Sequence, residues 1–427
     1  MSLAIATPNT ATARTAAPPL ERAEAPAHVT AAHTSAPSIR FEFITTRQAF
    51  DALEQEWTEL FARAGASAQL FQTFNWNWHW ANHYLGASPG GIAGLELCTL
   101  AGWREGRLVM VWPLVSERVR GITQIFWMGE PVSQYGDVVV ENVPGATQIM
   151  RDAWTYLRTH ARADVLRLRR VREDARVAPL LREMGALPTN PQIAPCLDLA
   201  SAKTFEACEQ RFTAKARRNR RRYMRRLEEQ GDVRFERHHG GQVARACAER
   251  AIDLKGKWLA SRGLVSRALS DARMRHFFAD VAQAASHPAG CVVSRLVAHG
   301  ETAALDVSFA CKGRVAVHII AFDLAFEKAG VGALLMERCI RDAYDEGIAV
   351  YDLMAPGDAY KLDWSDGSVG VSDWSLPLSI KGRAYVEIYL NALRARIKTA
   401  MAAAPKSMRR KLTAWRATGA QAAQRQE

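Results

Sequence analysis

Residues 315–354 read VAVHIIAFDLAFEKAGVGALLMERCIRDAYDEGIAVYDLM. This stretch begins with an apolar run of strand-forming residues and closes with a second such run over 348–354. Between the two runs, apolar residues recur at helical spacing over 331–346, and Gly347 ends the helix. The order is strand, glycine-containing loop, helix and strand, which predicts an α/β fold.

The loop before this helix has two glycines one residue apart. Such a pair lets the backbone come close to a ligand, and it exposes the first amides of the helix, where anions are attracted. A phosphate site is one interpretation and a plain turn is the other. A Rossmann fingerprint is excluded because Leu335 takes the third glycine position, and a Walker A loop because no lysine follows. The loop consists of Ala329, Gly330, Val331, Gly332 and Ala333.

This order, preceded by an antiparallel meander, resembles the acyl-coenzyme-A-binding core of the GNAT N-acyltransferase superfamily. The loop of that family reads Gln/Arg-x-x-Gly-x-Gly/Ala, and Gly330 and Gly332 match its two small positions. Glu327 stands where Gln or Arg is usual, and a carboxylate there repels a diphosphate. The resemblance implies acetyl-CoA, or another acyl-CoA, as the co-substrate bound by the loop.

Residues 351–364 read YDLMAPGDAYKLDW. They resemble the YD-L-x-x-G-x-x-x-YK-x-x-W signature of the CelD/BcsL branch of GNAT acetyltransferases, which is associated with cellulose and exopolysaccharide synthesis. Residues 70–76 and 215–222 match the same branch. The branch is related in fold to the FemAB aminoacyltransferases, which carry two GNAT-like domains in tandem. The resemblance therefore implies a FemAB-like α/β fold with tandem GNAT-like domains.

The organisation of the chain agrees with two such domains. Each half contains helices, three β-runs, a helix and a returning strand; the β-runs lie at 93–101, 107–116 and 122–129, and at 291–298, 302–311 and 314–322. The first 38 residues hold 12 Ala, 6 Thr and 5 Pro without any aromatic residue, so they cannot build a core. The prolines at 188, 191 and 195 suggest a boundary. The expected parts are a disordered tail (1–38), an N-terminal GNAT-like domain (39–190), a C-terminal acyltransferase domain (191–390) and a basic helical tail (391–427).

Composition limits the partners and the compartment. Lys+Arg 56 against Asp+Glu 44 gives a net charge of +12, which favours anionic partners. The 7 cysteines are scattered, and neither a signal peptide nor a membrane span is recognisable. These features predict a cytoplasmic protein, with attachment to the inner face of the membrane as an alternative. No metal is expected, because His79 and His83 lack the glutamate and the third ligand of a zinc motif.

The resemblance implies transfer of an acyl group to an amine or hydroxyl of a polysaccharide or cell-envelope precursor. Direct attack on a thioester needs a base and a group that stabilises the oxyanion. His318 is either that base or a satisfied strand histidine, and Asp352 is a base or an orienting partner. Lys361 is expected to offset negative charge or contact phosphate, and Tyr360 to protonate the thiolate or belong to the core. Asp306 is a weaker candidate.

Nine of the sixteen residues 211–226 are Arg or Lys and none is acidic. This run is either a solvated basic face or a site for an anionic acceptor or membrane surface, and no RNA-binding signature accompanies it. Two other functions stay open: an aminoacyl-tRNA-dependent transferase of the FemAB kind, and a non-catalytic accessory protein of polysaccharide synthesis. The residues expected to bind an anionic acceptor are Lys215, Arg217, Arg218, Arg221 and Arg222.

Overall fold

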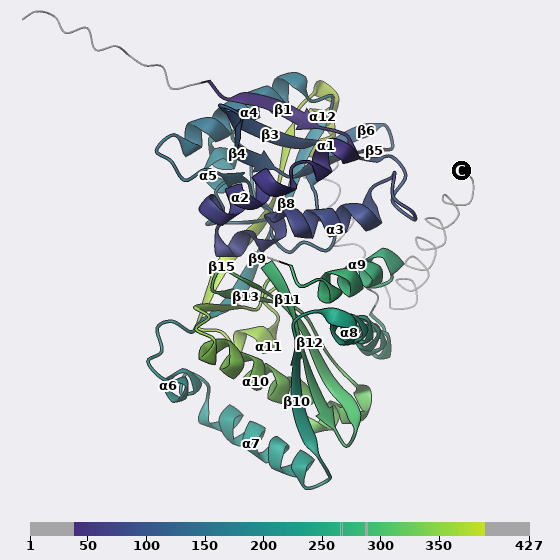
Figure 1. The fold of residues 1–427 in the computed structure, drawn as a ribbon, viewed down its shortest axis with the longest axis vertical. Helices are drawn as coiled ribbons and strands as arrows, with labels where there is room; N and C mark the ends of the chain where they lie inside the picture. The colour runs from purple at the N-terminus through teal and green to yellow at the C-terminus, as the bar shows by residue number, and fades with distance from the viewer. Residues whose placement is uncertain (1–37, 265, 267, 287–288, 389–427) are drawn as a thin grey trace, which may run out of the picture. The chain divides into compact units, whose positions relative to one another are not determined.

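The computed structural model describes residues 38–264, 266, 268–286 and 289–388 (Figure 1). Both expected tails, 1–38 and 391–427, lie outside this part of the chain apart from Ser38. Among the helices of the described residues, none combines the length and apolar composition needed to cross a bilayer.

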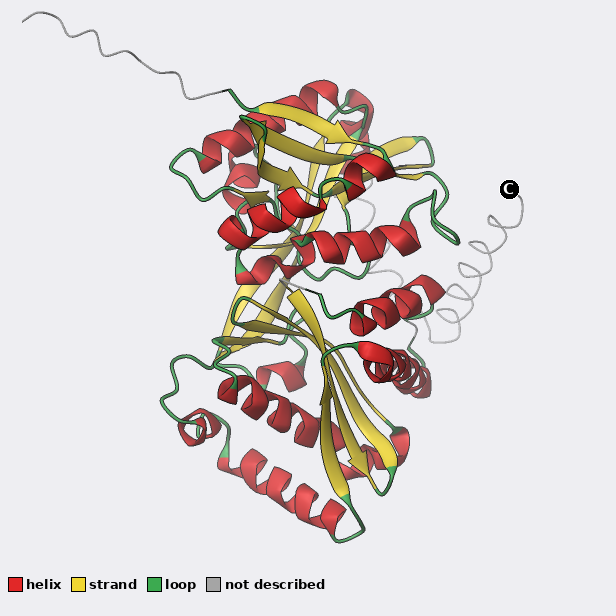
Figure 2. Ribbon diagram, in the orientation of Figure 1, coloured by secondary structure: helices red, strands yellow, loops and turns green. Residues whose placement is uncertain are grey.

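In the first half of the chain, a group of consecutive helices is followed by a group of consecutive strands (Figure 2). The three β-runs expected there are not three continuous strands. The first is divided at Cys98 and the second at Pro113. Proline has no N–H for a ladder, so the strand before it ends there. In chain order the elements are β1 (Arg40–Ile44), α1 (Arg47–Asp51), α2 (Glu54–Ala64), η1 (Ser67–Gln72), α3 (Phe74–Tyr84), β2 (Leu95–Leu97), β3 (Thr99–Arg104), β4 (Arg107–Trp112), β5 (Leu114–Val119), β6 (Ile122–Trp127), β7 (Val139–Val140), α4 (Ala146–His160), β8 (Val165–Arg172) and α5 (Ala178–Glu183).

The second half contains the meander that the sequence predicts, with antiparallel pairing of β11 to β12 and of β12 to β13. Residues 205–228 form two helices and not one, because Thr213 caps the second by accepting from the amide of Ala216. The elements are β9 (Thr189–Asp198), α6 (Phe205–Glu209), α7 (Ala214–Glu228), β10 (Val233–His238), α8 (Gly241–Ser261), α9 (Ala272–Gln283), β11 (Ala289–Ala298), β12 (Glu301–Cys311), β13 (Arg314–Phe322), η2 (Leu324–Ala329), α10 (Val331–Asp345), β14 (Val350–Asp352), α11 (Ala359–Leu362), β15 (Gly367–Pro377) and α12 (Ile380–Ala384).

One sheet runs through both halves. Its strand order is β10-β11-β12-β13-β14-β9-β15-β8-β6-β5-β2, and a second sheet has the order β1-β3-β4-β7. The late strand β15 pairs with β9 on one side and with β8 of the first half on the other. The prolines around residue 191 therefore do not interrupt the sheet, since β9 passes through Pro191 and Pro195.

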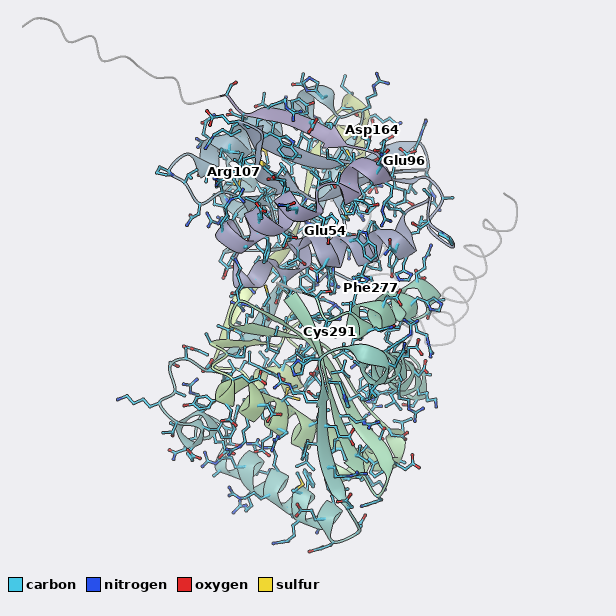
Figure 3. All side chains as sticks on the ribbon, in the orientation of Figure 1. Glu54, Glu96, Arg107, Asp164, Phe277 and Cys291 are labelled. Carbon is cyan, nitrogen blue, oxygen red and sulfur yellow. The ribbon has the colours of Figure 1, made fainter. Side chains whose placement is uncertain are left out.

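Helices cover both faces of the meander in the second half: α8 and α9 lie on one face and α10 lies on the other (Figure 1). The first core lies on the side of α8 and α9, and the second core lies on the side of α10. Alternation along β12 places Leu305, Val307 and Phe309 in the first core and Ala304 in the second. The first core continues into the N-terminal half. Phe277 of α9, labelled in Figure 3, lies 4.9 Å from the ring of Trp76 of α3.

Candidate active site

Strands β13 and β14 separate soon after they meet. They pair in parallel at only three residues of each strand, from Arg314 with Val350 to Ala316 with Asp352. Strand β14 ends at Asp352, whereas β13 continues to Phe322. Beyond Ala316, β13 therefore has no strand partner on this side, and its backbone groups there need other partners.

The separation begins at a β-bulge in β13. Val307 of β12 is opposite Ile319, and the next residue, Ser308, is opposite Val317. His318 is therefore the extra residue of the bulge. A bulge bends its strand and turns a side chain to a new direction. The sequence does not predict this bulge, because the residues around His318 are the apolar types found in any buried strand.

The two nitrogens of His318 have different surroundings. Nε2 lies 2.6 Å from the carbonyl oxygen of Val132, which only accepts, so Nε2 carries the hydrogen. The other nitrogen, Nδ1, is buried without a partner among the described residues. Burial lowers the pKa of His318 to about 4, and the charges of Arg170 and Lys361 act in the same direction. At neutral pH the ring is a neutral imidazole with an unused lone pair on Nδ1.

Two lysines stand at the gap between β13 and β14. Lys255 of α8 donates from Nζ to the carbonyl of Ile320 on β13, at 3.3 Å. Lys361 of α11 donates to the carbonyl of Met354, just after β14, at 3.0 Å. Burial lowers the pKa of Lys361 to about 8, and the charge of Lys255 acts in the same direction. Lys255 was not predicted, because one lysine in an amphipathic helix carries no sequence signal.

The backbone at Met354 is strained. Its φ is +57°, in the left-handed region that favours glycine. Asp352 accepts from its amide at 2.9 Å, and Lys361 donates to its carbonyl. Strain of this kind costs of the order of 1–3 kcal/mol and persists where surrounding bonds hold it. Lys361 therefore donates to a carbonyl whose orientation costs the folded state free energy.

Asp352 is fully buried and holds the two halves together. Its Oδ1 accepts from the hydroxyl of Tyr135 at 2.9 Å. Its Oδ2 lies 3.3 Å from a guanidinium nitrogen of Arg172 and 3.0 Å from one of Arg314. With the bond from Met354, four donors surround this carboxylate. The arrangement favours the orienting role of Asp352 over the role of base.

Tyr360 and Asp306 lie near each other but differ in exposure. Tyr360 is 42% exposed, so it is not a core residue. Burial of its hydroxyl raises its pKa to about 12, and the charges of Asp358 and Asp306 act in the same direction. Asp306 is buried, with Oδ2 accepting from Ser308 at 2.5 Å and Oδ1 without a partner among the described residues. Burial raises the pKa of Asp306 to about 7.

The two glycines of the loop are there for different reasons. Gly330 has a φ of +68° and is the N-cap of α10, and an added Cβ would lie 2.5 Å from the ring of Tyr223. Gly332 has an ordinary conformation, and an added Cβ would meet nothing closer than Phe322, at 3.6 Å. No side chain caps the first amides of α10. The loop therefore keeps an open, uncapped helix start, which suits the diphosphate of an acyl-CoA.

Glu327, which departs from the family pattern, is ion-paired. Its Oε1 lies 2.6 Å from a guanidinium nitrogen of Arg262, near the end of α8. The positive charge of Arg262 offsets the negative charge that would repel a diphosphate. Sequence reasoning missed this pair because the two residues are 65 positions apart.

The basic helix α7 lies beside this loop through Tyr223. Of the residues expected to bind an anion, Lys215, Arg218, Arg221 and Arg222 are exposed. Arg217 instead donates to the carbonyls of Glu209 and Phe212, each at 3.1 Å, and so stabilises the turn before the helix. The unpredicted Arg220 is buried. It pairs with Glu337 at 2.6 Å, and its guanidinium lies 4.7 Å from the ring centre of Trp364.

Two cavities occur elsewhere in the described residues. A cavity of about 740 Å³ lies in the first half, with Arg47, Glu96 and His160 in its wall. A second of about 180 Å³ is lined by Arg172, Arg314 and their neighbours. Neither includes the glycine loop or the two lysines. Within the described part of the chain, no group of three or more His, Cys, Asp or Glu side chains is placed to hold a metal ion.

Residues 214–362 match the family model of the acetyltransferase (GNAT) domain. The match runs from α7 to α11 and includes the bulge, the glycine loop and both lysines. This part of the chain is similar to a GNAT acetyltransferase domain, and the protein is an acyltransferase. The expected enzyme class is thereby confirmed. No match to a curated protein sequence was found.

The fold is similar to the crystal structure of FemX, with a TM-score of 0.54 and 12% identity over 82% of this chain and 99% of FemX. This likeness confirms the expected FemAB-like mixed α/β fold. Two further structures are L-PGS from Bacillus licheniformis (TM-score 0.47, 9% identity, 80% of this chain and 96% of that one) and a tandem GNAT protein from the clavulanic acid biosynthesis pathway (TM-score 0.44, 14% identity, 80% and 99%).

Proposed function

We propose that this acyltransferase takes its acyl group from acetyl-CoA and transfers it to an amine or hydroxyl of a polysaccharide or cell-envelope precursor. The observation that carries the first part is the gap that opens between β13 and β14 at the His318 bulge, next to the uncapped start of α10. The second part rests on the resemblance of residues 351–364 to the CelD/BcsL signature.

Acetyl-CoA supplies, when bound, an acetyl group activated as a thioester. The residues that would hold it are Gly330, Gly332 and the first amides of α10, with Arg262 neutralising Glu327. Backbone amides and a helix dipole stabilise phosphate groups without a side-chain cation. The exposed arginines of α7 add positive charge beside the loop, since Tyr223 of that helix packs against Gly330.

The side chains at the gap fit the proton transfers that acyl transfer needs. The lone pair on Nδ1 of His318 is available to accept a proton from the attacking amine or hydroxyl, since the ring is neutral at physiological pH. Lys361 keeps most of its charge at pH 7, so its ammonium group can stabilise developing negative charge or return a proton. Asp352 keeps the strand end and Met354 in place.

The identity of the acyl donor separates this proposal from the alternatives. Calorimetry of the full chain with acetyl-CoA, and with an alanyl-tRNA, measures both donors directly. We expect acetyl-CoA to bind with micromolar affinity and tRNA to bind only weakly, with a steep dependence on salt. Binding of charged tRNA in preference to uncharged tRNA, without binding of acetyl-CoA, would support the aminoacyl transferase instead. Binding of neither donor would support an accessory protein.

A further inference from the structure

Helix α8 and its C-cap residue carry three cations that contact β13 and the segment after it, each with a different partner. Arg250 pairs with Asp323 at 3.1 Å, and Arg262 pairs with Glu327 at 2.6 Å. Lys255 lies between them in the sequence, and no carboxylate oxygen of the described residues is within ion-pair distance of its Nζ. Its hydrogen-bond partner is the carbonyl of Ile320. Lys255 is therefore the one of the three cations without an ion pair among the described residues, and the charge of Asp358 acts on it from a longer distance.

Lys361 provides a second ammonium group at the same place. Its nearest carboxylate is that of Asp358, 3.9 Å away on a side chain that is 54% exposed. The two ammonium groups are close enough for the charge of Lys255 to lower the pKa of Lys361. Two like charges in a partly buried site repel each other, and a bound anion would remove that repulsion.

A third donor lies beside Lys255. The indole Nε1 of Trp258, one turn further along α8, is buried without a hydrogen-bond partner among the described residues. The Nζ of Lys255 is 4.9 Å from the centre of this ring. A buried N–H without an acceptor destabilises the folded state. The region therefore has two ammonium groups, each bonded to a backbone carbonyl, and one indole N–H without an acceptor among the described residues.

We propose that Lys255, Lys361 and Trp258 bind an anionic group, a carboxylate or a phosphate, carried by the acceptor. This inference rests on the proposed function, because the two lysines lie at the gap where the acyl group would be transferred. The charge of Lys361 also acts on His318, so the anion site and the proton acceptor share one region. The diphosphate of acetyl-CoA has its own site at the start of α10. The acceptor is thus an anionic amine or alcohol, not a neutral sugar.

Inorganic phosphate serves as the probe. Its affinity for the full chain is measured by calorimetry in saturating CoA, which occupies the glycine loop, and again without CoA. We expect Lys255→Gln and Lys361→Gln to weaken phosphate binding about tenfold or more, as for loss of a charge-assisted hydrogen bond. Lys255→Arg should retain binding. Lys257→Gln is the matched control, an exposed lysine of the same helix, and should behave as the wild type.

A second measurement needs no variant. Phosphate should protect Lys255 and Lys361, but not Lys257, from acylation by acetic anhydride, as read by peptide mass spectrometry. Equal phosphate affinity in wild type and Lys255→Gln, or no protection of the two lysines, would overturn the inference. Displacement of phosphate by CoA would assign the cations to the CoA phosphates and overturn the acceptor class. If CoA fails to bind while phosphate still depends on Lys255, the anion site stands and the acetyl-CoA proposal fails.

Discussion

The hydroxyl of Tyr135 donates a 2.9 Å hydrogen bond to Oδ1 of Asp352, across 217 positions of the chain. Arg172 of β8 and Arg314 of β13 approach the other oxygen of the same carboxylate. Asp352 therefore joins the N-terminal half, the meander and the end of β14 at one buried point. The gap between β13 and β14 opens directly from this point. The carboxylate therefore fixes the geometry of the site without taking part in the proton transfers.

Replacing Asp352 should act on stability before it acts on chemistry. Asp352→Asn removes the charge that compensates two largely buried guanidinium groups, and breaking such an arrangement costs about 3–5 kcal/mol. Urea unfolding measures this loss. Asp174→Asn is the control, because Asp174 pairs with Arg172 at 2.8 Å but is 56% exposed, and we expect a much smaller loss there. Unchanged stability in Asp352→Asn with lost turnover would instead make Asp352 the base.

Asp306 predicts a pH dependence of stability. Burial raises its pKa from 3.8 to about 7, so the folded chain binds a proton that the unfolded chain has released at intermediate pH. The stability that this group contributes is complete below pH 4 and is lost as the pH rises through 7. Asp306→Asn keeps the shape without the charge. Its free energy of unfolding, relative to wild type, should rise by a few kcal/mol between pH 4 and pH 8. Parallel pH profiles would show that Asp306 titrates normally.

His318 is expected to act in turnover. In His318→Gln the amide can still donate to Val132, but it has no basic nitrogen. Loss of a general base costs about 10²–10⁴ in rate, measured as thiol release from acetyl-CoA with an acceptor that supports turnover. Since the pKa of His318 is lowered to about 4, wild-type kcat/KM should not fall between pH 7 and pH 5.5 through this group. A limb near pH 6.5 would point to another base.

Arg220 and Arg222 lie two residues apart on α7. Substituting each in turn should separate an effect on stability from an effect on CoA binding. Arg220→Gln breaks a buried pair with Glu337 and should lower the melting temperature. Arg222→Gln removes an exposed charge whose guanidinium lies 5.4 Å from the ring centre of Tyr223, the residue that packs on Gly330. We expect it to keep the melting temperature and to weaken CoA binding severalfold at low salt, with the effect fading at high salt. An unchanged CoA affinity at low salt would leave Arg222 on a solvated face.

The sequence predicted the parts of the fold that depend on local pattern. The three strands of the second meander, the helix after Gly330 and the returning strand all follow from apolar spacing and turn residues. The single sheet through both halves could not be foreseen, because β15 pairs with β8 about 200 positions earlier in the chain, as Val371 does with Arg172. Pairing between distant strands has no local signal.

The same limit applies to the site. Gly330, His318 and Lys361 were named from a family resemblance, and the structure places His318 and Lys361 within electrostatic reach of each other. Lys255 and Arg262 were missed, since their roles come from the carbonyl of Ile320 and the carboxylate of Glu327, both more than 60 positions away. In the sequence Arg217 looks like the other basic residues of 211–226, and only the fold shows that it holds the preceding turn.

The most direct test of the acyl-CoA site compares two glycines of one loop by calorimetry with CoA and by thermal unfolding. Gly332→Asp adds a negative charge where an added Cβ makes only ordinary contact with Phe322, so we expect an unchanged melting temperature and a loss of CoA affinity of at least about a hundredfold. Gly330→Ala forces a side chain into a φ of +68° against Tyr223, so we expect a lower melting temperature. Equal CoA affinity in wild type and a fully folded Gly332→Asp would contradict the assignment of the acyl-CoA site to the start of α10.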